Sequence, residues 1–269
     1  MPKDINILIE SLKEHKDAVI IVGSKATTIT VIDEEGNEEK VNMFFEPTEE
    51  NKEIFSRKTM VKEPDKFWSF YNCSILKAFD EKSMPSAYEN IIGLIGIGLI
   101  KTVIDFNCDG ILEKATDNIN YIPIKGNRNR LQCVRCKEYI ELDNPITITS
   151  NALTHNDINC GGKIKPTIPF LNEKYDQKHI TDMFKSIFKY DKDDNVIGLN
   201  THNLILIGVD FEEDLIDNII AGFNEFKRRE NASTVFITDN EDLMMNAYEA
   251  DFGTTYDISE SISKLCNLL

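Results

Sequence analysis

Residues 101–115 read KTVIDFNCDGILEKA, and this stretch decides how the rest of the chain is interpreted. The part from Lys101 to Asp105 is rich in β-branched and apolar residues, which predicts a strand. Asn107 and Asp109 come directly after it. In open sheets of parallel strands, ligands bind beyond the carboxyl ends of the strands, so this amide and this carboxylate are placed to contact one. An Asx-rich turn that caps a helix is the alternative interpretation.

The segments on either side alternate between strand and helix patterns. Apolar or β-branched runs of strand length predict strands at 18–22, 28–32, 204–208 and 234–237. Apolar residues at helical spacing predict helices at 5–15, 64–79, 85–100, beyond 208 as far as 227, near 240–248 and at 258–267. Strand and helix in this order predict an α/β fold with a sheet of parallel strands.

A cysteine motif interrupts this alternation in the middle of the chain. Cys133 and Cys136 are separated by two residues, and Cys160 follows about two dozen residues later. Two thiolates at this spacing can grip one tetrahedral zinc ion, and a distant second pair closes such a site. Position 157 lacks the second cysteine of that pair, so Asp157 or His155 is the predicted fourth ligand. The alternative is a lobe that holds together by packing without metal.

Composition limits the partners and the compartment. The formal net charge of −16 repels polyanions, which argues against nucleic acid as a general partner. Solubility explains this acidity, and a preference for a basic protein or peptide is the alternative. The longest apolar run, 91–100, is too short to span a membrane. The six cysteines, in a chain that begins without a signal pattern, indicate a reducing compartment, and we expect a cytoplasmic protein.

Three ordered motifs in the chain resemble those of the sirtuins. The stretch from Asn107 to Ala115 keeps the Asn, Asp, Gly, Glu and Ala of the sirtuin pattern T-Q-N-I-D-G-L-H-E-x-A. The family's His-Gly pair, whose Gly is separated from the first zinc cysteine by six residues, corresponds to Lys125-Gly126. The stretch 160–173, CGGKIKPTIPFLNE, is similar to the family's C-G-G-x-I-K-P-D-V-V-F-F-G-E. The resemblance spans roughly residues 18–267.

This resemblance implies a fold and a set of ligands. It implies a Rossmann-like domain of residues 1–120 and 186–269, with a small zinc-binding insert at 121–185, in a sirtuin or DHS-like NAD-binding fold. NAD or ADP-ribose is the implied ligand, an acyl-lysine protein the implied partner, and the zinc is structural. The residues implied in nucleotide binding are Gly23, Ser24, Lys25, Asn107, Asp109 and Gly208. Lys125 and Asn107 occupy the catalytic positions.

The sequence departs from the family pattern in the nucleotide half of the site. The family's Gly-Ala-Gly-x-Ser loop reads GSKAT here, so that Lys25 stands where a glycine lets backbone approach a phosphate. Phe106 replaces a glutamine and cannot hydrogen-bond a ribose. Asp210, two residues after Gly208, would repel a phosphate. A pocket filled by Lys25 or Phe106 is therefore the alternative to one that holds a nucleotide.

The catalytic and peptide positions depart as well. In sirtuins the histidine that Lys125 replaces accepts a proton from a ribose hydroxyl. The reference pKa of lysine is about 10.4 against about 6.5 for histidine, so a lysine without special burial stays protonated at neutral pH. Pro169 replaces a valine in the segment against which the acyl-lysine peptide adds as a strand, which removes a backbone donor. Asn172 replaces a glycine in the same segment.

Three functions are consistent with this pattern. The favoured one is a diverged sirtuin that binds NAD or ADP-ribose and whose deacylase activity is weak or lost. The second is an active NAD-consuming transferase, either a deacylase or an ADP-ribosyltransferase or NAD glycohydrolase. The third is a non-catalytic interaction protein. Asn107 and Asp109 favour the first two, whereas Lys125 and the altered loop favour the first and the third.

Overall fold

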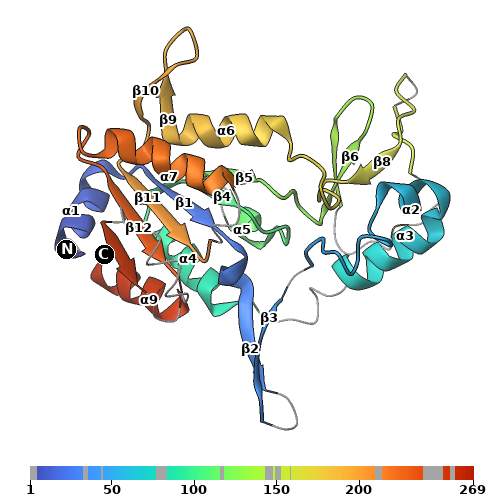
Figure 1. Ribbon diagram of the computed structural model, residues 1–269, viewed down its shortest axis with the longest axis horizontal. Helices are drawn as coiled ribbons and strands as arrows, with labels where there is room; N and C mark the ends of the chain where they lie inside the picture. Colours follow the sequence, from blue (N-terminus) through green and yellow to red (C-terminus); the bar gives the residue numbers. More distant parts are fainter. Residues whose placement is uncertain are drawn as a thin grey trace.

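A six-stranded parallel sheet forms the centre of the larger lobe (Figure 1). The computed structural model describes residues 5–32, 36–43, 45–76, 84–115, 118–142, 148, 153–157, 159–209, 214–238, 251–254 and 258–269. The strands, in their spatial order, are β13 (Phe252–Thr254), β12 (Ser233–Ile237), β11 (Asn203–Ile207), β1 (Ala18–Val22), β4 (Ile100–Asp105) and β5 (Asn120–Pro123). The chain proceeds outward from β1 in one direction and from β11 in the other. The order therefore reverses between β1 and β11, which is where sheets of this type bind ligands.

Helices cover both faces of this sheet. The helices are α1 (Ile5–His15), α4 (Ser86–Gly96) and α9 (Ile258–Leu268) on one face, with α6 (Gln177–Ile187) and α7 (Asp214–Lys227) on the other. Alternate residues of β1 serve the two faces, since Ile20 and Val22 pack in the first apolar cluster and Val19 and Ile21 in the second. This double burial explains the continuous apolar run of the strand.

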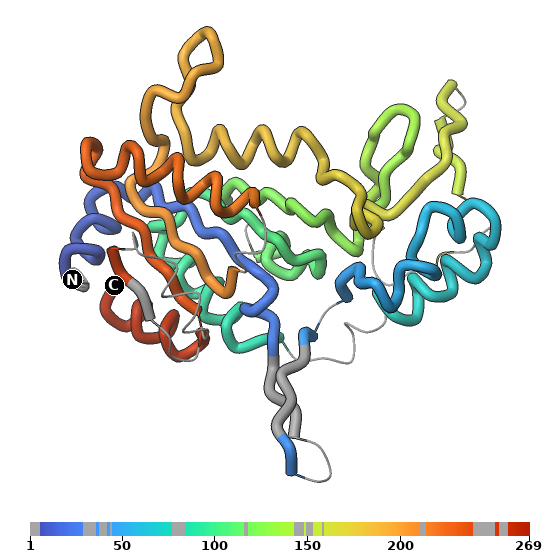
Figure 2. The backbone as a smooth tube through the Cα atoms, in the orientation of Figure 1, coloured from blue at the N-terminus to red at the C-terminus, as the bar shows by residue number. Residues whose placement is uncertain are grey.

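A smaller lobe lies beside the sheet, at the right of Figure 2. Its three-stranded sheet has the order β7 (Tyr139–Glu141), β6 (Arg130–Cys133) and β8 (Ile164–Pro166), with both pairs antiparallel. The α2 helix (Arg57–Lys62), the α3 helix (Pro64–Phe70) and the wide helical turn η2 (Tyr71–Leu76) supply nearly half of its apolar core. Trp68, the single tryptophan of the chain, is buried in this core.

Residues on both sides of the predicted insert share in these lobes. The core of the small lobe combines Phe55 and Phe67 with Leu131 and Ile168 from the insert itself. At the other end of the insert, α6 packs in the apolar cluster of the large lobe. The boundaries of the insert at 121 and 185 stay a prediction.

The other predicted elements are present wherever the structure describes them. Residues 28–32 form a strand, β2 (Thr28–Ile32), but it pairs only with β3 (Glu38–Asn42) in a hairpin that projects from the large lobe. A second projecting hairpin joins β9 (Phe188–Tyr190) to β10 (Val196–Leu199). The helix predicted at 85–100 ends at Gly96, because Gly98 adopts a φ of +78° and the chain turns into β4.

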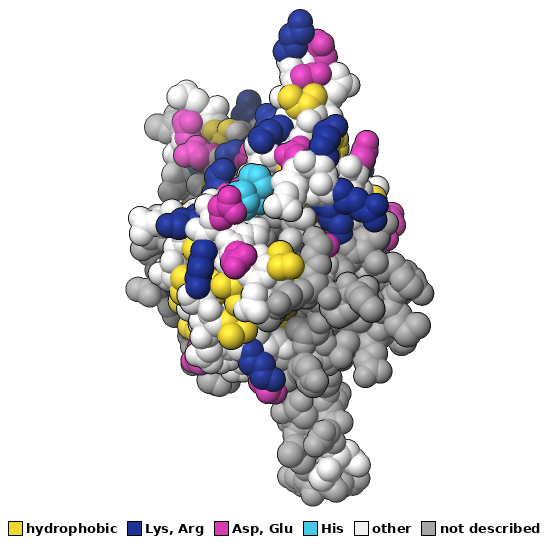
Figure 3. Space-filling model, turned by 90° about the vertical axis from the view of Figure 1, so that its left-hand side faces the viewer, with side chains coloured by type: hydrophobic (Ala, Val, Ile, Leu, Met, Phe, Trp, Pro, Cys, Tyr) yellow, Lys and Arg dark blue, Asp and Glu magenta, His cyan; other side chains and the backbone are white. Residues whose placement is uncertain are grey.

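Two of the sequence predictions fall outside the described residues, namely the helix near 240–248 and the position of Asp210. In the described part of the chain, no helix is long and apolar enough to cross a membrane. The face shown in Figure 3 intersperses basic with acidic side chains among the residues it describes, so that part of the surface carries no continuous basic patch.

Candidate functional site

The carboxyl ends of β1 and β11 meet at the switch point of the sheet, and their backbones are in close contact. The N–H of Gly23 donates to Ile207 O at 2.9 Å, and the N–H of Lys25 donates to Gly208 O at 3.0 Å. A Cβ on Gly23 would collide with the carbonyl oxygen of Gly208, and one on Gly208 with the backbone nitrogen of Ala26. These backbone groups, which would cradle a phosphate in a nucleotide site, are thus bonded to each other.

The short 3-10 helix η1 (Ser24–Thr27) continues this closed arrangement. The Thr27 hydroxyl donates to the Ser24 carbonyl at 2.7 Å, and the N–H of Ala26 donates to Gly23 O at 3.1 Å. The loop after β1 therefore turns back on itself before the β2–β3 hairpin begins. Lys25 is partly exposed on this turn.

Asn107 and Asp109 lie beyond the end of β4, as the sequence indicates, but both side chains point into the protein. Asn107 is 5% exposed and its Nδ2 donates to Gly23 O at 3.2 Å. Asp109 is 1% exposed. Its Oδ1 accepts the N–H of Ile111 at 2.7 Å, and its Oδ2 accepts the Tyr88 hydroxyl at 2.8 Å. Each carboxylate oxygen of Asp109 thus has a donor from within the chain.

A second buried carboxyl, Asp105, stands behind this pair. Its Oδ1 accepts the N–H of Asn107 and its Oδ2 the hydroxyl of Tyr121, each at 2.8 Å. Burial raises the pKa of Asp105, and repulsion from Asp109 raises it further. Burial also raises the pKa of Asp109, although the bonds from Ile111 and Tyr88 and the charge of Arg128 oppose that rise. The neutral form is therefore favoured most at Asp105.

Lys125 closes the remaining space at this end of the cleft. Its Nζ lies 3.9 Å from Glu46 Oε1, and 23% of its side chain is exposed. The cavity beside Lys125 and Asn107 has a volume of about 20 Å³, which holds about one water molecule. Phe45 and Phe106 line it, and Cys108 Sγ donates to Phe45 O at 3.0 Å. The described residues at this end do not fit a nicotinamide ring.

A wider cavity opens on the other side of Lys125. Its volume is about 620 Å³, and its walls include Glu46, Pro169, Asn172 and Leu215. The segment that holds Pro169 and Asn172 follows β8, and it is the one against which the sirtuin resemblance places an acyl-lysine peptide. Lys125 thus stands between a filled end and an open end of the same cleft.

The three cysteines of the small lobe converge on a histidine. The ligand atoms of Cys133, Cys136, His155 and Cys160 all lie within 4.8 Å of one another. Cys133 Sγ is 3.5 Å from Cys160 Sγ, and Cys136 Sγ is 3.5 Å from His155 Nδ1. Ligands at 2.0–2.3 Å from one tetrahedral ion, as is usual for zinc, would stand about this far apart. The donor set and its spacing fit zinc.

Asp157 lies beside this cluster without joining it. Its carboxylate accepts the N–H of Asn159 at 2.8 Å, and its backbone carbonyl accepts the N–H groups of Cys160 and Gly161. A Cβ on Gly162 would collide with the sulfur of Cys133, so only glycine fits there. Asp157 and the glycines shape the turn that presents Cys160. His155 is thus the fourth residue that the structure brings to the cysteines.

The Cys133 thiol is poised to ionise. Hydrogen bonds from the backbone N–H groups of Cys136 and Arg135 lower its pKa to about 7, although burial opposes this. A thiolate binds metal, whereas a thiol does not, so these N–H groups favour the metal-binding form. Sequence reasoning identified the cysteines but missed Glu46, Phe45 and Tyr88, because no motif marks the side chains that fill the cleft.

Together these features define a class: a doubly wound, Rossmann-like α/β protein with a small lobe built around a cysteine-histidine cluster. A sequence model of the Sir2 family matches residues 41–201, which is more than half of the chain. The chain belongs to the Sir2 family.

Solved structures share this fold at low sequence identity. One is a Sir2 homologue in complex with NAD, with a TM-score of 0.65 and 15% identity over 98% of this chain and 93% of that one. A mutant Sir2 homologue in complex with 2′-O-acetyl ADP ribose gives 0.64 and 17%, covering 99% and 96% of the two chains. Sir2 bound to acetylated peptide gives 0.62 and 17%, covering 99% and 98%. No curated protein sequence matches the chain significantly.

Proposed function

We propose that this chain is a Sir2-family protein whose deacylase activity is weak or lost and whose retained role is binding. The observation that carries this proposal is the 20 Å³ cavity where Asn107 and Lys125 meet. Deacylation in this family begins with release of nicotinamide, and the described residues leave no room for that ring. The second half of the reaction, after nicotinamide has left, also needs a proton acceptor at position 125, where an ammonium faces the Glu46 carboxylate instead.

The retained role in this proposal is binding of NAD or ADP-ribose. Gly23 and Gly208 still meet at the switch point of the sheet with Asn107 beside them, which supports a nucleotide nearby. Similar structures hold NAD and 2′-O-acetyl ADP ribose. ADP-ribose lacks the nicotinamide, so it needs less space at the filled end of the cleft than NAD does. We therefore expect ADP-ribose to bind more tightly than NAD. Asp109→Ala should weaken binding of NAD, whose nicotinamide carboxamide the Asp109 carboxylate is expected to contact, and should leave binding of ADP-ribose, which lacks that group, unchanged.

The cysteine cluster supports one structural zinc ion, held by Cys133, Cys136, His155 and Cys160. Such an ion would fix the β6–β7 hairpin and the turn before β8. The open cavity beside Lys125 supports an acyl-lysine or basic protein as partner, because the chain carries a net charge of −16 and a similar structure holds an acetylated peptide. Pro169 limits that contact, since it offers no backbone donor.

Activity assays test the proposal. The wild-type protein should show negligible NAD-dependent deacetylation of acetyl-lysine peptides at neutral pH. Lys125→His alone should not restore it, because Phe106 and the Phe45–Glu46 segment still fill the nicotinamide end. Robust wild-type deacetylation that Lys125→Ala abolishes would overturn the proposal. Nicotinamide release without deacetylation would point instead to an NAD glycohydrolase or transferase, with Asn107 positioning the attacking water.

A further inference from the structure

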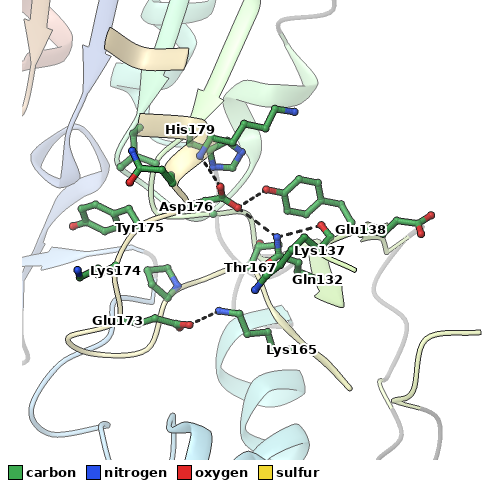
Figure 4. A pocket seen from close by; sticks show the side chains of 16 residues that line it. Gln132, Lys137, Glu138, Lys165, Thr167, Glu173, Lys174, Tyr175, Asp176 and His179 are labelled. Carbon is green, nitrogen blue, oxygen red and sulfur yellow. Dashed lines mark hydrogen bonds and ion pairs between the residues drawn. The ribbon is translucent and has the colours of Figure 1, made fainter. Parts of the chain in front are cut away.

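A second large cavity lies apart from Lys125 and Asn107, between the small lobe and the start of α6 (Figure 4). Its volume is about 670 Å³, within the range of sites that bind small molecules. The β6–β7 hairpin contributes Gln132, Lys137 and Tyr139, β8 contributes Lys165, and the first turn of α6 contributes His179. Both lobes thus supply walls of this cavity.

The carboxylates of the cavity already have partners. Asp176 accepts the Tyr139 hydroxyl at 2.8 Å, Gln132 Nε2 at 3.4 Å and the N–H of Lys178 at 2.9 Å. Glu173 accepts Lys165 Nζ at 2.7 Å through Oε1, and its Oε2 accepts the N–H of Phe170 at 3.0 Å. These acids are therefore committed to holding the walls together, as the dashed lines of Figure 4 show.

Several polar groups of the cavity have no such partner. Among the described residues, none lies within ion-pair distance of the Lys137 ammonium, and none donates to Gln132 Oε1. Gln132 is 7% exposed, but its Oε1 is open to the cavity, where water or a ligand can donate a hydrogen bond to it. The His179 and Tyr139 rings are stacked, with their centroids 6.1 Å apart. Neither ring nitrogen of His179 has a hydrogen-bond partner among the described residues.

The balance of charge favours an anion. Four lysines line the cavity against three acids, in a chain whose net charge is −16. In Figure 4 the side chains of Lys137 and Lys165 point into the cavity. Lysine ammonium groups bind phosphate as point charges, and Gln132 Oε1 can accept a hydrogen bond from a hydroxyl group. One ligand that offers both is a phosphate ester of a polyol.

We propose that this cavity binds a small phosphorylated sugar, whose phosphate contacts Lys137 and Lys165 and whose hydroxyl group donates to Gln132 Oε1. The His179 ring would border the sugar. This site adjoins the open cavity beside Lys125, with which it shares Pro169, Glu173, Lys174, Tyr175 and Gln177, but neither Lys125 nor Asn107 lines it. A ligand held by both lobes would also stabilise their contact, because it binds the folded arrangement alone.

Calorimetry at low salt with ribose 5-phosphate tests the proposal, with ribose and inorganic phosphate as the reference ligands. We expect binding that is tighter for ribose 5-phosphate than for either reference and that weakens as salt rises. Lys137→Asn should weaken it by about tenfold or more, the usual effect of losing a charge-assisted hydrogen bond. Asparagine is the better replacement because Lys137 has a φ of +66°, which asparagine tolerates.

Gln132→Leu should weaken binding of ribose 5-phosphate by a similar factor while phosphate alone loses little. Lys192→Asn, in the exposed turn between β9 and β10, is the matched control and should bind as the wild type does. No binding at millimolar concentration, or equal affinity in Lys137→Asn, would overturn the proposal. Trp68 fluorescence verifies that each variant keeps the small lobe folded.

Discussion

The cysteine cluster and the nucleotide end of the cleft differ in what their polar groups contact. In the cluster, Cys136 Sγ and His155 Nδ1 face each other across 3.5 Å, and the other ring nitrogen of His155 lies 3.4 Å from Glu138 Oε2. At the nucleotide end, Asp109 and Asn107 are bonded to Tyr88 and Gly23 of the same chain. The first region is shaped for a ligand that the protein does not itself provide. The second has satisfied its own donors and acceptors.

Residues that are retained from a family pattern can therefore be in one of two situations: bonded to other residues of the chain, or facing a site for a ligand. A buried polar group must have a partner, and where no ligand supplies one, the chain itself does. Tyr88 and the Phe45–Glu46 segment do this at the nucleotide end. Nothing comparable occupies the centre of the cysteine cluster among the described residues, since four ligand atoms converge there. Retention of a motif residue therefore indicates retained binding only when its side chain still faces open space.

Removal of metal from the cluster should have the largest effect. We expect one zinc per chain in protein purified without chelator, and none in Cys133→Ser. Because zinc sites of this kind contribute on the order of 10 kcal/mol to folding, the small lobe should loosen while the parallel sheet stays folded. Trp68 fluorescence reports on the small lobe, and far-ultraviolet circular dichroism on the whole. Cys73→Ser, at an exposed position outside the cluster, is the control. Metal-free wild-type protein would contradict the assignment.

The fourth ligand can be identified by comparing two neighbouring variants. His155→Ala should weaken zinc affinity by at least about a hundredfold, since losing even a supporting partner of a ligand costs up to that much. Asp157→Ala should change it little, because the Asp157 side chain bonds only to the N–H of Asn159. Competition with a zinc-binding dye measures both affinities. The reverse order of the two effects would assign Asp157 as the ligand.

Tyr88→Phe tests the nucleotide end of the cleft, where residues of the same chain supply the hydrogen-bond partners. The change leaves Asp109 Oδ2 without its donor in a buried setting, which should lower the free energy of unfolding by about 1–3 kcal/mol. Urea denaturation measures the loss. Tyr190→Phe, in the projecting β9–β10 hairpin, is the matched control and should be close to neutral. If Tyr88→Phe were also neutral, Asp109 would not be held as the structure has it, and the contrast with the cysteine cluster would fail.

The smallest expected effect is on pH dependence, through His179. Burial lowers its pKa below the ordinary value of 6.5, although Asp176 opposes that change. The unfolded chain then binds a proton at His179 before the folded chain does, so this residue's contribution to stability is complete above about pH 6.5 and falls as the pH drops below it. His179→Phe, which keeps a ring against Tyr139, should flatten the profile of unfolding free energy between pH 5 and 7. An unchanged profile would contradict this role.

Local patterns predicted most of the large lobe. The run from Ala18 to Val22 predicted a strand buried on both faces, and alternate side chains do enter different apolar clusters. The spacing of Cys133, Cys136 and Cys160 predicted their convergence. These predictions depend on the spacing of residues along one segment, or on metal-ligand side chains that must come together around one ion. The pairing of residues 28–32 was not evident, because a β-branched run does not say which sheet it joins.

The sequence by itself determined the parallel α/β sheet, the cysteine-rich lobe, and the lysine where the family has histidine. Only the tertiary structure decided what each of them contacts. Asp109 is the same residue in the motif whether it faces a ligand or Tyr88, and the tyrosine lies on a different helix, 21 residues earlier in the chain. His155 and Asp157 are equally acceptable zinc ligands by chemistry, but the turn before Cys160 directs only the imidazole toward the thiols. The physical reason is that burial and hydrogen bonding depend on contacts between distant segments, which no local pattern records.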